Sequence, residues 1–302
     1  MATHVITGAF SYTGKYIARR LLTEGHTLRT LTGRPRADDP FASEIEAFPL
    51  DFSSHTALTG AMHGADTLYN TYWIRFARGS MTFERALENT RALIGAAVDA
   101  GVRRIVHVSV TNASSASPLA YFRGKGLVEE AIHTSGLSYG IVRPTLVFGL
   151  EDVLVNNIAW TLRRMPVMAA ASGGRFEFQP VYVDDVAEIA VAAGREDANV
   201  TWDAVGPDRT TTRDLIHLVA RAIGRRALVM PLPPPLFRLS STMLGLMLRD
   251  VIMTRDELAS LMGGLLTSPD PPRGRTSLRE WARENASSLG RRYASEVARH
   301  YR

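Results

Sequence analysis

The feature that most constrains the fold is a small-residue turn between an apolar run at the N-terminus and a helical pattern. His4-Val5-Ile6 reads as a short strand, and the turn Thr7–Gly14 leads directly into a helix expected over Lys15–Glu24. The apolar run begins almost at the initiator Met, so we expect no signal or transit peptide. A strand, a glycine turn and a helix in this order are typical of the first unit of a parallel α/β sheet.

Short apolar runs alternate with helical patterns through the first two-thirds of the chain, which indicates βαβ units. The further predicted strands are Leu28–Leu31, Phe48–Leu50, Thr67–Tyr69, Ile105–Val108 and Ser138–Val142. The further predicted helices are Ala57–His63, Thr82–Ala100 and Tyr121–Thr134. Right-handed crossovers then give an α/β fold with a Rossmann-type, doubly wound parallel sheet, whose ligands bind beyond the carboxyl ends of the strands.

The first turn has the chemistry of a phosphate-binding loop. Gly8 and Gly14 let the backbone turn tightly and approach a pyrophosphate, while the first N–H groups of the helix point at the anion. Ser11 stands where such turns usually carry glycine, and its hydroxyl can also bond a phosphate. We therefore predict a bound dinucleotide. The residues expected to contact it here are Gly8, Phe10, Ser11, Tyr12, Thr13 and Gly14.

The end of the second predicted strand indicates which dinucleotide binds. An acidic residue there accepts the ribose 2′-hydroxyl of NAD, whereas an arginine pairs with the 2′-phosphate of NADP. Thr32 and Gly33 end this strand without an acid and Arg34 follows, so NADP(H) is favoured over NAD(H). Asp51 and Phe52, after the third strand, are expected to meet the adenine.

After Gly149, apolar runs no longer alternate regularly with helical patterns, which predicts two domains. Residues 1–150 form the dinucleotide-binding domain, to which residues 176–200 return. Residues 151–175 and 201–302 form a smaller, mostly helical C-terminal lobe.

Three segments after residue 150 have interpretable patterns. Phe176–Val183 reads as one strand, and Asp184–Gly194 reads as a helix that an aspartate caps. Leu236–Leu248 is apolar but too short to span a bilayer, so it is a membrane-surface helix, a lid over substrate or plain core. Because this stretch lacks a basic face of its own, core or lid packing is favoured.

Composition narrows the classes of function. The formal net charge of +5 is scattered, without a Lys/Arg-rich tract, which argues against nucleic acid as a partner. The chain has no cysteine, which excludes disulfides and thiolate chemistry and fits a cytoplasmic location. The histidines show no ligand spacing, so no metal site is expected. No apolar run approaches the ~20 residues of a membrane span.

A tyrosine and one of the two lysines form a candidate catalytic pair. The lysines are Lys15 and Lys125, and Tyr121 precedes Lys125 by one helical turn, on the same face of a predicted helix. A nearby ammonium stabilises tyrosinate, so the phenol can act as acid or base below its usual pKa of about 10. A surface pair that only stabilises the helix is the alternative.

Several motifs together resemble the extended and atypical short-chain dehydrogenase/reductase superfamily, including its epimerase/dehydratase-like and NmrA-like members. The motifs are Thr7–Gly14, Asn89, Gly101–Ser109, Tyr121 with Lys125, Arg143–Gly149 and Gln179–Ala187. The resemblance implies that Tyr121 donates and accepts the proton, and that Lys125 binds the nicotinamide ribose and lowers the pKa of the tyrosine. It also implies that Pro144 and Thr145 lie beside the nicotinamide.

The chain departs from that superfamily in the hydroxyl that binds the substrate carbonyl. This hydroxyl usually stands at the position that Val110 occupies here. Ser109 and Thr111 flank it and are the candidate replacements, although strand alternation points them away from the side of Val110.

A second departure follows the fourth predicted strand, where small residues are usual. Asn70 is a candidate for cofactor binding, and Tyr72, Trp73 and Arg75 are candidates for a substrate pocket. The alternatives are core packing for the two aromatic rings and a solvent-exposed position for Arg75.

Three functions are compatible with these patterns. The first is an NADP(H)-dependent oxidoreductase that reduces a small carbonyl or quinone-like substrate, with Tyr121 as proton donor. The second is a nucleotide-sugar epimerase or dehydratase, and the third is an NAD(P)-binding sensor or accessory protein without turnover, which Val110 favours. The superfamily resemblance also implies a possible homodimer through Thr82–Ala100 and Tyr121–Thr134.

Overall fold

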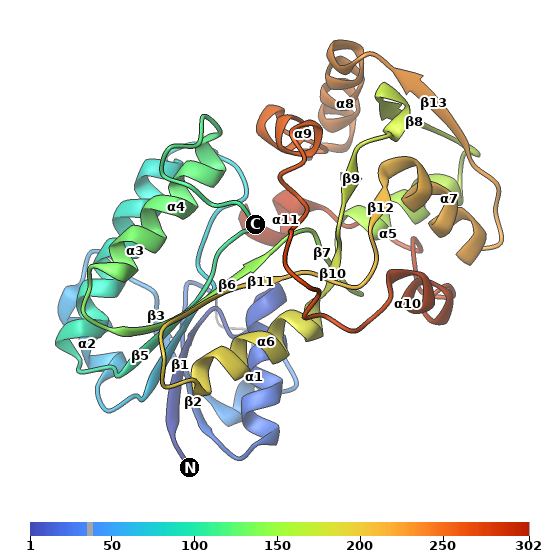
Figure 1. Ribbon diagram of the computed structural model, residues 1–302. Coiled ribbons are helices and arrows are strands. Elements are labelled where there is room, and N and C mark those ends of the chain that lie inside the picture. The colour runs from blue at the N-terminus through green and yellow to red at the C-terminus, as the bar shows by residue number, and fades with distance from the viewer. Residues whose placement is uncertain (35–38, 302) are drawn as a thin grey trace. The chain divides into compact units, whose positions relative to one another are not determined.

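The computed structural model describes residues 1–34 and 39–301, and the chain divides into two compact units. Unit 1 comprises Met1–Pro144 and Val183–Ala204, and unit 2 comprises Thr145–Tyr182 and Val205–Arg302. Figure 1 labels their helices and strands, and each unit is described separately.

The described part of unit 1 is built on a seven-stranded sheet in which every neighbouring pair is parallel. The strand order is β11-β6-β5-β4-β1-β2-β3. The bounds are β1 (Thr3–Thr7), β2 (Thr27–Thr32), β3 (Ile45–Pro49), β4 (Thr67–Asn70), β5 (Arg104–Val108), β6 (Ser138–Pro144) and β11 (Val200–Ala204). The order reverses between β1 and β4, so their carboxyl ends form the topological switch point. The predicted Rossmann-type fold is confirmed.

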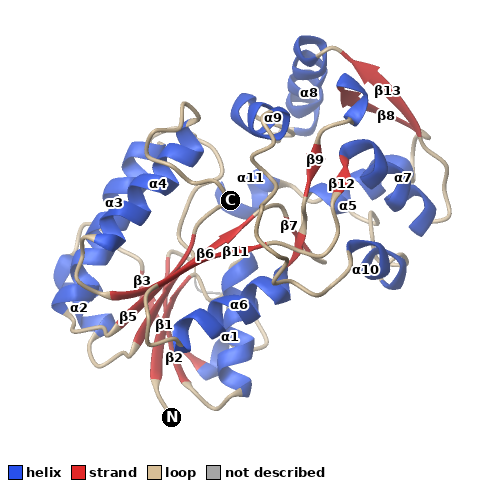
Figure 2. Ribbon diagram, viewed as in Figure 1, coloured by secondary structure: helices blue, strands red, loops and turns tan. Residues whose placement is uncertain are grey.

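Helices cover both faces of this sheet, as Figure 2 shows. They are α1 (Tyr12–Thr23), α2 (His55–Met62), α3 (Phe83–Asp99), α4 (Ala120–His133) and α6 (Val183–Arg195). Leu58, Leu93 and Val128 from α2, α3 and α4 are buried in one apolar cluster with Val5 and Ile105 of the sheet. Burial of such side chains is the main term that stabilises this layer.

On the opposite face of the sheet, α1 packs against α6. Arg20 of α1 donates two hydrogen bonds of 2.9 Å to the carboxylate of Asp184 in α6. The sequence predicts that an aspartate caps this helix. Asp184 does not cap it, because α6 begins at Val183 and Asp184 lies inside its first turn.

Unit 2 combines short two-stranded sheets with helices. The strand pairs are β7 (Val147–Phe148) with β10 (Val181–Tyr182), β9 (Glu177–Phe178) with β12 (Thr210–Thr211), and β8 (Val167–Ala171) with β13 (Leu228–Leu232). The helices are α5 (Leu154–Leu162), α7 (Thr212–Ala222), α8 (Pro234–Leu248), α9 (Arg255–Met262), α10 (Leu278–Glu284) and α11 (Glu296–Tyr301). No helix in the described residues is long and apolar enough to cross a membrane.

The single strand predicted over Phe176–Val183 is wrong. The structure has β9 and β10 instead, which are separated by Gln179 and Pro180 and pair with different strands. Gln179 is buried, and its side-chain amide donates to the Gly206 carbonyl at 2.9 Å. Proline has no N–H for a ladder, so the strand is interrupted here.

Candidate cofactor-binding site

The turn after β1 is as tight as the sequence predicts. The Gly8 amide donates to the Leu31 carbonyl of β2 at 2.8 Å, and the Ser11 amide donates to the Gly8 carbonyl at 2.8 Å. Gly8 has a φ of 70°, and a Cβ on Gly14 would lie 2.1 Å from the Gly8 oxygen. Glycine is therefore required at position 14 for the turn to close onto the start of α1.

The start of α1 has the donors that an anion needs. Ser11 is the N-cap residue, but its side chain makes no capping hydrogen bond. The first N–H groups of a helix have no carbonyl partner within the helix, and they carry the positive end of its dipole. Tyr12 and Thr13 are half-buried in this first turn, whereas Phe10 is buried beneath it.

The ends of β2 and β3 carry the candidate adenosine contacts. Arg34 is exposed just beyond β2, and its amide donates to the Thr32 hydroxyl at 3.1 Å. The exposed Asp51 carboxylate accepts from the hydroxyl of Ser53 at 2.6 Å and from its amide at 2.9 Å, which holds the pKa of Asp51 below its usual value. The half-buried ring of Phe52 packs on Tyr72, with ring centres 4.7 Å apart.

A buried hydrogen-bond network joins the carboxyl ends of β1, β4 and β5. The Thr7 hydroxyl donates to the Asn70 oxygen at 3.1 Å and accepts from the Tyr72 amide at 3.1 Å. The Asn70 nitrogen lies 3.1 Å from Nδ1 of His107. Since an amide nitrogen can only donate, Nδ1 is the acceptor and the neutral ring carries its proton on Nε2.

His107 is held in this neutral state. Burial, and then the charge of Lys125, keep the pKa of His107 well below its usual range. Its Nε2 is buried and has no hydrogen-bond partner among the described residues. Both polar atoms of the Asn70 side chain are thus used in this network, which fixes the chain after β4. The Nε2 donor of His107 has no acceptor among the described residues.

Lys125 on α4 is anchored at the end of β5. It is only 3% exposed, and its Nζ donates to the Val108 carbonyl at 2.6 Å. Burial lowers the pKa of Lys125 to about 7, and the carboxylate of Glu129 acts in the opposite direction. Tyr121 is half-buried on the same helix, and its ring meets Phe83 edge-on, with centres 6.1 Å apart.

Trp73 lies against α4 beside the lysine. Its ring centre is 5.1 Å from the Lys125 Nζ, and a Cβ on Gly124 would come within 2.7 Å of the indole. The indole Nε1 is buried and has no hydrogen-bond partner in the part of the chain that the structure describes. Trp73 is therefore close to the candidate catalytic pair, whereas Arg75 lies along the Phe76 ring at 6.0 Å.

The two candidate replacement hydroxyls are both used within unit 1. Ser109 donates to the buried carboxylate of Glu129, which also pairs with Arg143. The Thr111 hydroxyl donates to the Arg143 carbonyl at 2.8 Å, and Val110 between them is buried. A hydroxyl has one proton to donate, so neither group can donate to a substrate without giving up its present bond.

The last two candidates fall at the boundary between the units. Pro144 ends β6 in unit 1, where its carbonyl accepts from the Thr111 amide at 3.0 Å. Thr145 is the first residue of unit 2, and its hydroxyl donates to the Gln179 carbonyl. Pro144 is therefore part of the candidate site in unit 1, and Thr145 belongs to unit 2.

The comparisons with known proteins agree with this geometry. A family model described as NAD(P)H-binding matches residues 8–197. The chain belongs to this NAD(P)H-binding family. This match bears out the predicted likeness to NAD(P)-binding proteins.

Curated relatives of this NAD(P)H-binding protein include subunits of a respiratory enzyme. It is 27% identical, over 76% of its length, to the Arabidopsis thaliana "NADH dehydrogenase [ubiquinone] 1 alpha subcomplex subunit 9, mitochondrial". It is 30% identical to the Mus musculus subunit of the same name, over 62% of its length. The chain spans 60% of the first relative's length and 50% of the second's.

Solved structures show the same fold at low identity. An NADPH-dependent quinone oxidoreductase from Escherichia coli, complexed with NADPH, superposes with a TM-score of 0.76 at 20% identity, covering 94% of this chain and 98% of that one. A UDP-N-acetylglucosamine 4-epimerase from Bacillus cereus superposes with a TM-score of 0.66 at 16% identity, covering 91% and 100%.

The residues of unit 1 fit a dinucleotide. The backbone at Gly8 and Gly14 leaves no room for a Cβ at position 14, and the helix start supplies N–H donors to a pyrophosphate. The buried ammonium of Lys125 has three donor protons, of which the structure assigns one to Val108. These are the donor types that phosphate and ribose oxygens require.

Sequence reasoning missed the residues that hold the site together. Thr7, His107 and Arg143 are noted there only as members of longer motifs, without a role of their own, and Glu129 is not singled out. These residues are polar groups at strand ends or one helical turn after Lys125. They could be recognised as part of the site only once the strand order is known, because it brings these strand ends together.

Proposed function

We propose that unit 1 holds NADP(H) and that the protein is a reductase of a small carbonyl or quinone-like compound. The observation that carries this proposal is the placement of Tyr121 and Lys125 on α4, with the Lys125 ammonium fixed at the carboxyl end of β5. In doubly wound sheets, ligands bind at this end of the strands. The bound cofactor would supply the hydride.

The roles of the chain's own groups follow from their chemistry. The Tyr121 hydroxyl donates its proton to the carbonyl oxygen of the substrate as the carbonyl carbon receives the hydride. Lys125 holds the ribose hydroxyls. With a pKa of about 7, it is about half protonated at neutral pH and carries a positive charge at lower pH. The bulky rings of Tyr72 and Trp73 shape the substrate side of the site.

The preference for NADP(H) is supported by the end of β2. Arg34 is exposed there, and Thr32 and Gly33 offer no carboxylate to the 2′-hydroxyl of NAD. A guanidinium pairs well with a 2′-phosphate.

The experiment is NADPH consumption with a panel of aldehydes, ketones and quinones, in parallel with NADPH binding followed by fluorescence. We expect Tyr121→Phe to lower turnover by roughly 10²–10⁴-fold, the usual contribution of a general acid, while NADPH affinity is retained. Tyr139→Phe removes a phenol hydroxyl from β6 and is the matched control. Equal turnover in wild type and Tyr121→Phe would refute the role of Tyr121.

A second candidate function is NADP(H) binding without turnover, as a sensor or accessory protein. The observation in its favour is that Ser109 and Thr111 both donate within unit 1 while Val110 is buried between them. The relatives named as NADH dehydrogenase subunits favour it as well. NADPH binding with no turnover of any substrate class would support this candidate over the reductase.

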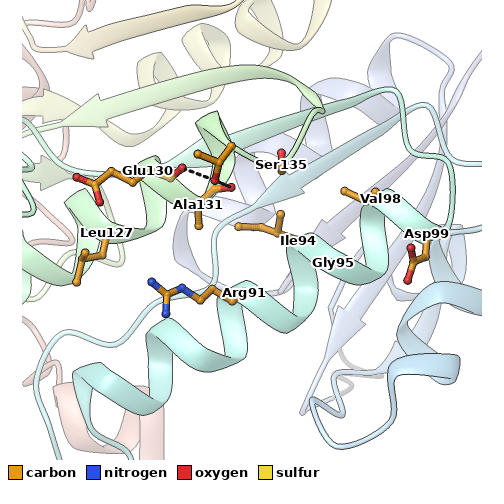
Figure 3. Close-up of a pocket in the computed structure, with 10 residues that line it drawn as sticks. Arg91, Ile94, Gly95, Val98, Asp99, Leu127, Glu130, Ala131 and Ser135 are labelled. Atoms are coloured by element: carbon orange, nitrogen blue, oxygen red, sulfur yellow. Dashed lines mark hydrogen bonds between the residues drawn. The ribbon is translucent and has the colours of Figure 1, made fainter.

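A homodimer through α3 and α4 is also proposed, from the superfamily resemblance. Between these helices lies a pocket of about 550 Å³, which Figure 3 shows. Its lining includes Arg91, Ile94 and Val98 from α3, and Leu127, Glu130 and Ala131 from α4. Analytical ultracentrifugation of wild type and of Val98→Glu would test it, with a monomer expected for the variant only.

A further inference from the structure

Helix α8 presents its large apolar side chains to the outside of unit 2. Of its residues, all of which are described, Ser241 and Gly245 are buried. A Cβ on Gly245 would lie 2.7 Å from the Asp250 carbonyl oxygen, so this contact face requires a minimal side chain. The exposed apolar residues are Leu236, Leu239, Met243, Leu244, Leu246 and Met247. Of the two alternatives favoured for Leu236–Leu248, core or lid packing, the exposure of these side chains contradicts core packing.

The exposed residues form one face of the helix. An α-helix turns by about 100° per residue, so these six side chains project over an arc of about 160°. The centre of this arc lies opposite the side that carries Ser241 and Gly245. Leu246 and Met247 are the most open of the six, at 75% and 81% exposure. An amphipathic helix normally turns such a face inward.

The strands next to α8 also carry exposed apolar residues. β8 contacts α8 and pairs with β13, and Figure 1 shows the three elements side by side. Leu228 and Met230 are exposed on the same side of β13, and Met165 is exposed just before β8. Contiguous exposed apolar patches on a protein mark sites of interaction with proteins or membranes. We call α8 together with Met165, Leu228 and Met230 the α8 surface.

The sequence segments that contain β8, β13 and α8 carry charge of one sign. Residues 153–176, which contain β8, and residues 215–249, which contain β13 and α8, hold eight arginines and no aspartate or glutamate. The exposed arginines are Arg164, Arg175, Arg221, Arg225, Arg226, Arg238 and Arg249. The basic character that α8 lacks alone is therefore supplied by the segments around it.

Of the acidic residues near the ends of these segments, Glu177 is exposed, whereas Asp214, Asp250 and Glu257 accept hydrogen bonds. Asp250 is buried and accepts from the Tyr293 hydroxyl at 2.8 Å and from the Val297 amide at 2.9 Å. Asp214 accepts from the Thr211 hydroxyl at the start of α7, and Glu257 accepts from the Thr254 amide in the capping box of α9. Asp214 and Glu257 are thus held in the first turns of α7 and α9, and Asp250 is buried, while the seven arginines are exposed.

We infer that the α8 surface binds the face of a bilayer that contains anionic phospholipids. An apolar helix face with surrounding arginines is the combination that inserts at the level of the lipid headgroups. Each arginine near an anionic membrane contributes about a fivefold gain in binding, from about 1 kcal/mol per charge. An apolar groove of another protein would require no such excess of positive charge.

The test is flotation of the full-length protein with two kinds of vesicle. One kind is phosphatidylcholine alone, and the other is phosphatidylcholine mixed with phosphatidylglycerol. We expect wild type to float with the mixed vesicles, more weakly with phosphatidylcholine, and less at high salt, because salt screens exposed charges. Failure to float with either kind of vesicle would overturn the inference.

Variants separate the apolar and charged contributions. Leu246→Glu with Met247→Glu should lower binding by at least about tenfold, because two side chains that insert become charged. Arg225→Glu with Arg226→Glu should lower binding to the mixed vesicles only. Leu150→Glu, at an exposed apolar residue of unit 2 outside the α8 surface, is the matched control and should float like wild type.

Two outcomes would point elsewhere. If Leu246→Glu with Met247→Glu floats as well as Leu150→Glu, the α8 surface does not bind the bilayer. If wild type does not float but sediments as a dimer that this double variant dissociates, the α8 surface is a contact between two copies of the chain. Circular dichroism of each variant confirms that it is folded, so a loss of flotation reports on the surface.

Discussion

The buried ammonium of Lys125 makes a prediction about stability against pH. Burial lowers the pKa of this lysine from 10.5 to about 7 in the folded protein. At pH below 7, the lysine is protonated in both the folded and the unfolded state, so the full cost of burying the charge is present. Between pH 7 and 10.5, the unfolded chain binds a proton that the folded protein does not bind. The free energy of unfolding therefore rises with pH across this window.

The size of the effect follows from the same shift. One pKa unit corresponds to about 1.4 kcal/mol, so the full window is worth on the order of 5 kcal/mol as an upper bound. Methionine has a similar length to lysine without its charge. Compared with Lys125→Met, wild type should gain stability by about 1.4 kcal/mol per pH unit above pH 7, and the variant should be the more stable of the two at lower pH.

Urea unfolding at a series of pH values measures this difference. Groups that do not interact with Lys125 titrate alike in both proteins, so they cancel in the comparison. Lys15→Met is the control for the loss of a lysine, since Lys15 is the other lysine of the chain and is half-buried. Parallel curves for wild type and Lys125→Met, separated by a constant free energy, would refute the assignment of a depressed pKa to Lys125.

Three further substitutions test the site. Gly14→Ala should destabilise the protein by about 1–3 kcal/mol in urea unfolding and abolish NADPH binding, because the added Cβ would lie 2.1 Å from the Gly8 carbonyl oxygen. Gly60→Ala in α2, where the added Cβ has open space, is the control and should be neutral or stabilising. Arg34→Ala should weaken NADPH about 10–100-fold in a titration and leave NADH unchanged, whereas an equal loss for both would disprove the 2′-phosphate contact. Glu129→Gln should cost about 3–5 kcal/mol of unfolding free energy, because Arg143 loses a buried ionic partner, and a loss below about 1 kcal/mol would show that the pair is solvated.

The six strands predicted for the sheet are all present, because each is a short apolar run between turn residues. The seventh, β11, was missed. It is the edge strand of the sheet, and Thr201 on it is exposed, so Val200–Ala204 lacks the apolar run of a central strand. Its identity depends on pairing with β6, about sixty residues away in sequence, which local patterns do not contain.

The candidate site was predictable only where a motif carries the chemistry. The glycine turn and the Tyr121–Lys125 spacing are local, and the structure places them at the start of α1 and on α4. The partners of Ser109 and of Asn70 are not local, because Glu129 and His107 come from other elements. Ser109 and Thr111 were therefore proposed as substrate contacts, although their hydroxyls are used inside unit 1.

Three groups whose burial costs stability lie near the carboxyl ends of β4 and β5, although the Nδ1 of His4 and the hydroxyl of Thr59 are also buried without a partner in the described part of the chain. Lys125 carries a buried charge, and the Nε2 of His107 and the Nε1 of Trp73 are buried donors without an acceptor among the described residues. A buried donor without an acceptor costs about 1–3 kcal/mol. Such costs are typical of functional sites, where a bound molecule completes the missing contacts. No hydroxyl at positions 109–111 is available to polarise a substrate, because Ser109 and Thr111 donate within unit 1 and position 110 is valine. Several independent features therefore support dinucleotide binding, whereas turnover depends on Tyr121. Binding and turnover must therefore be measured separately.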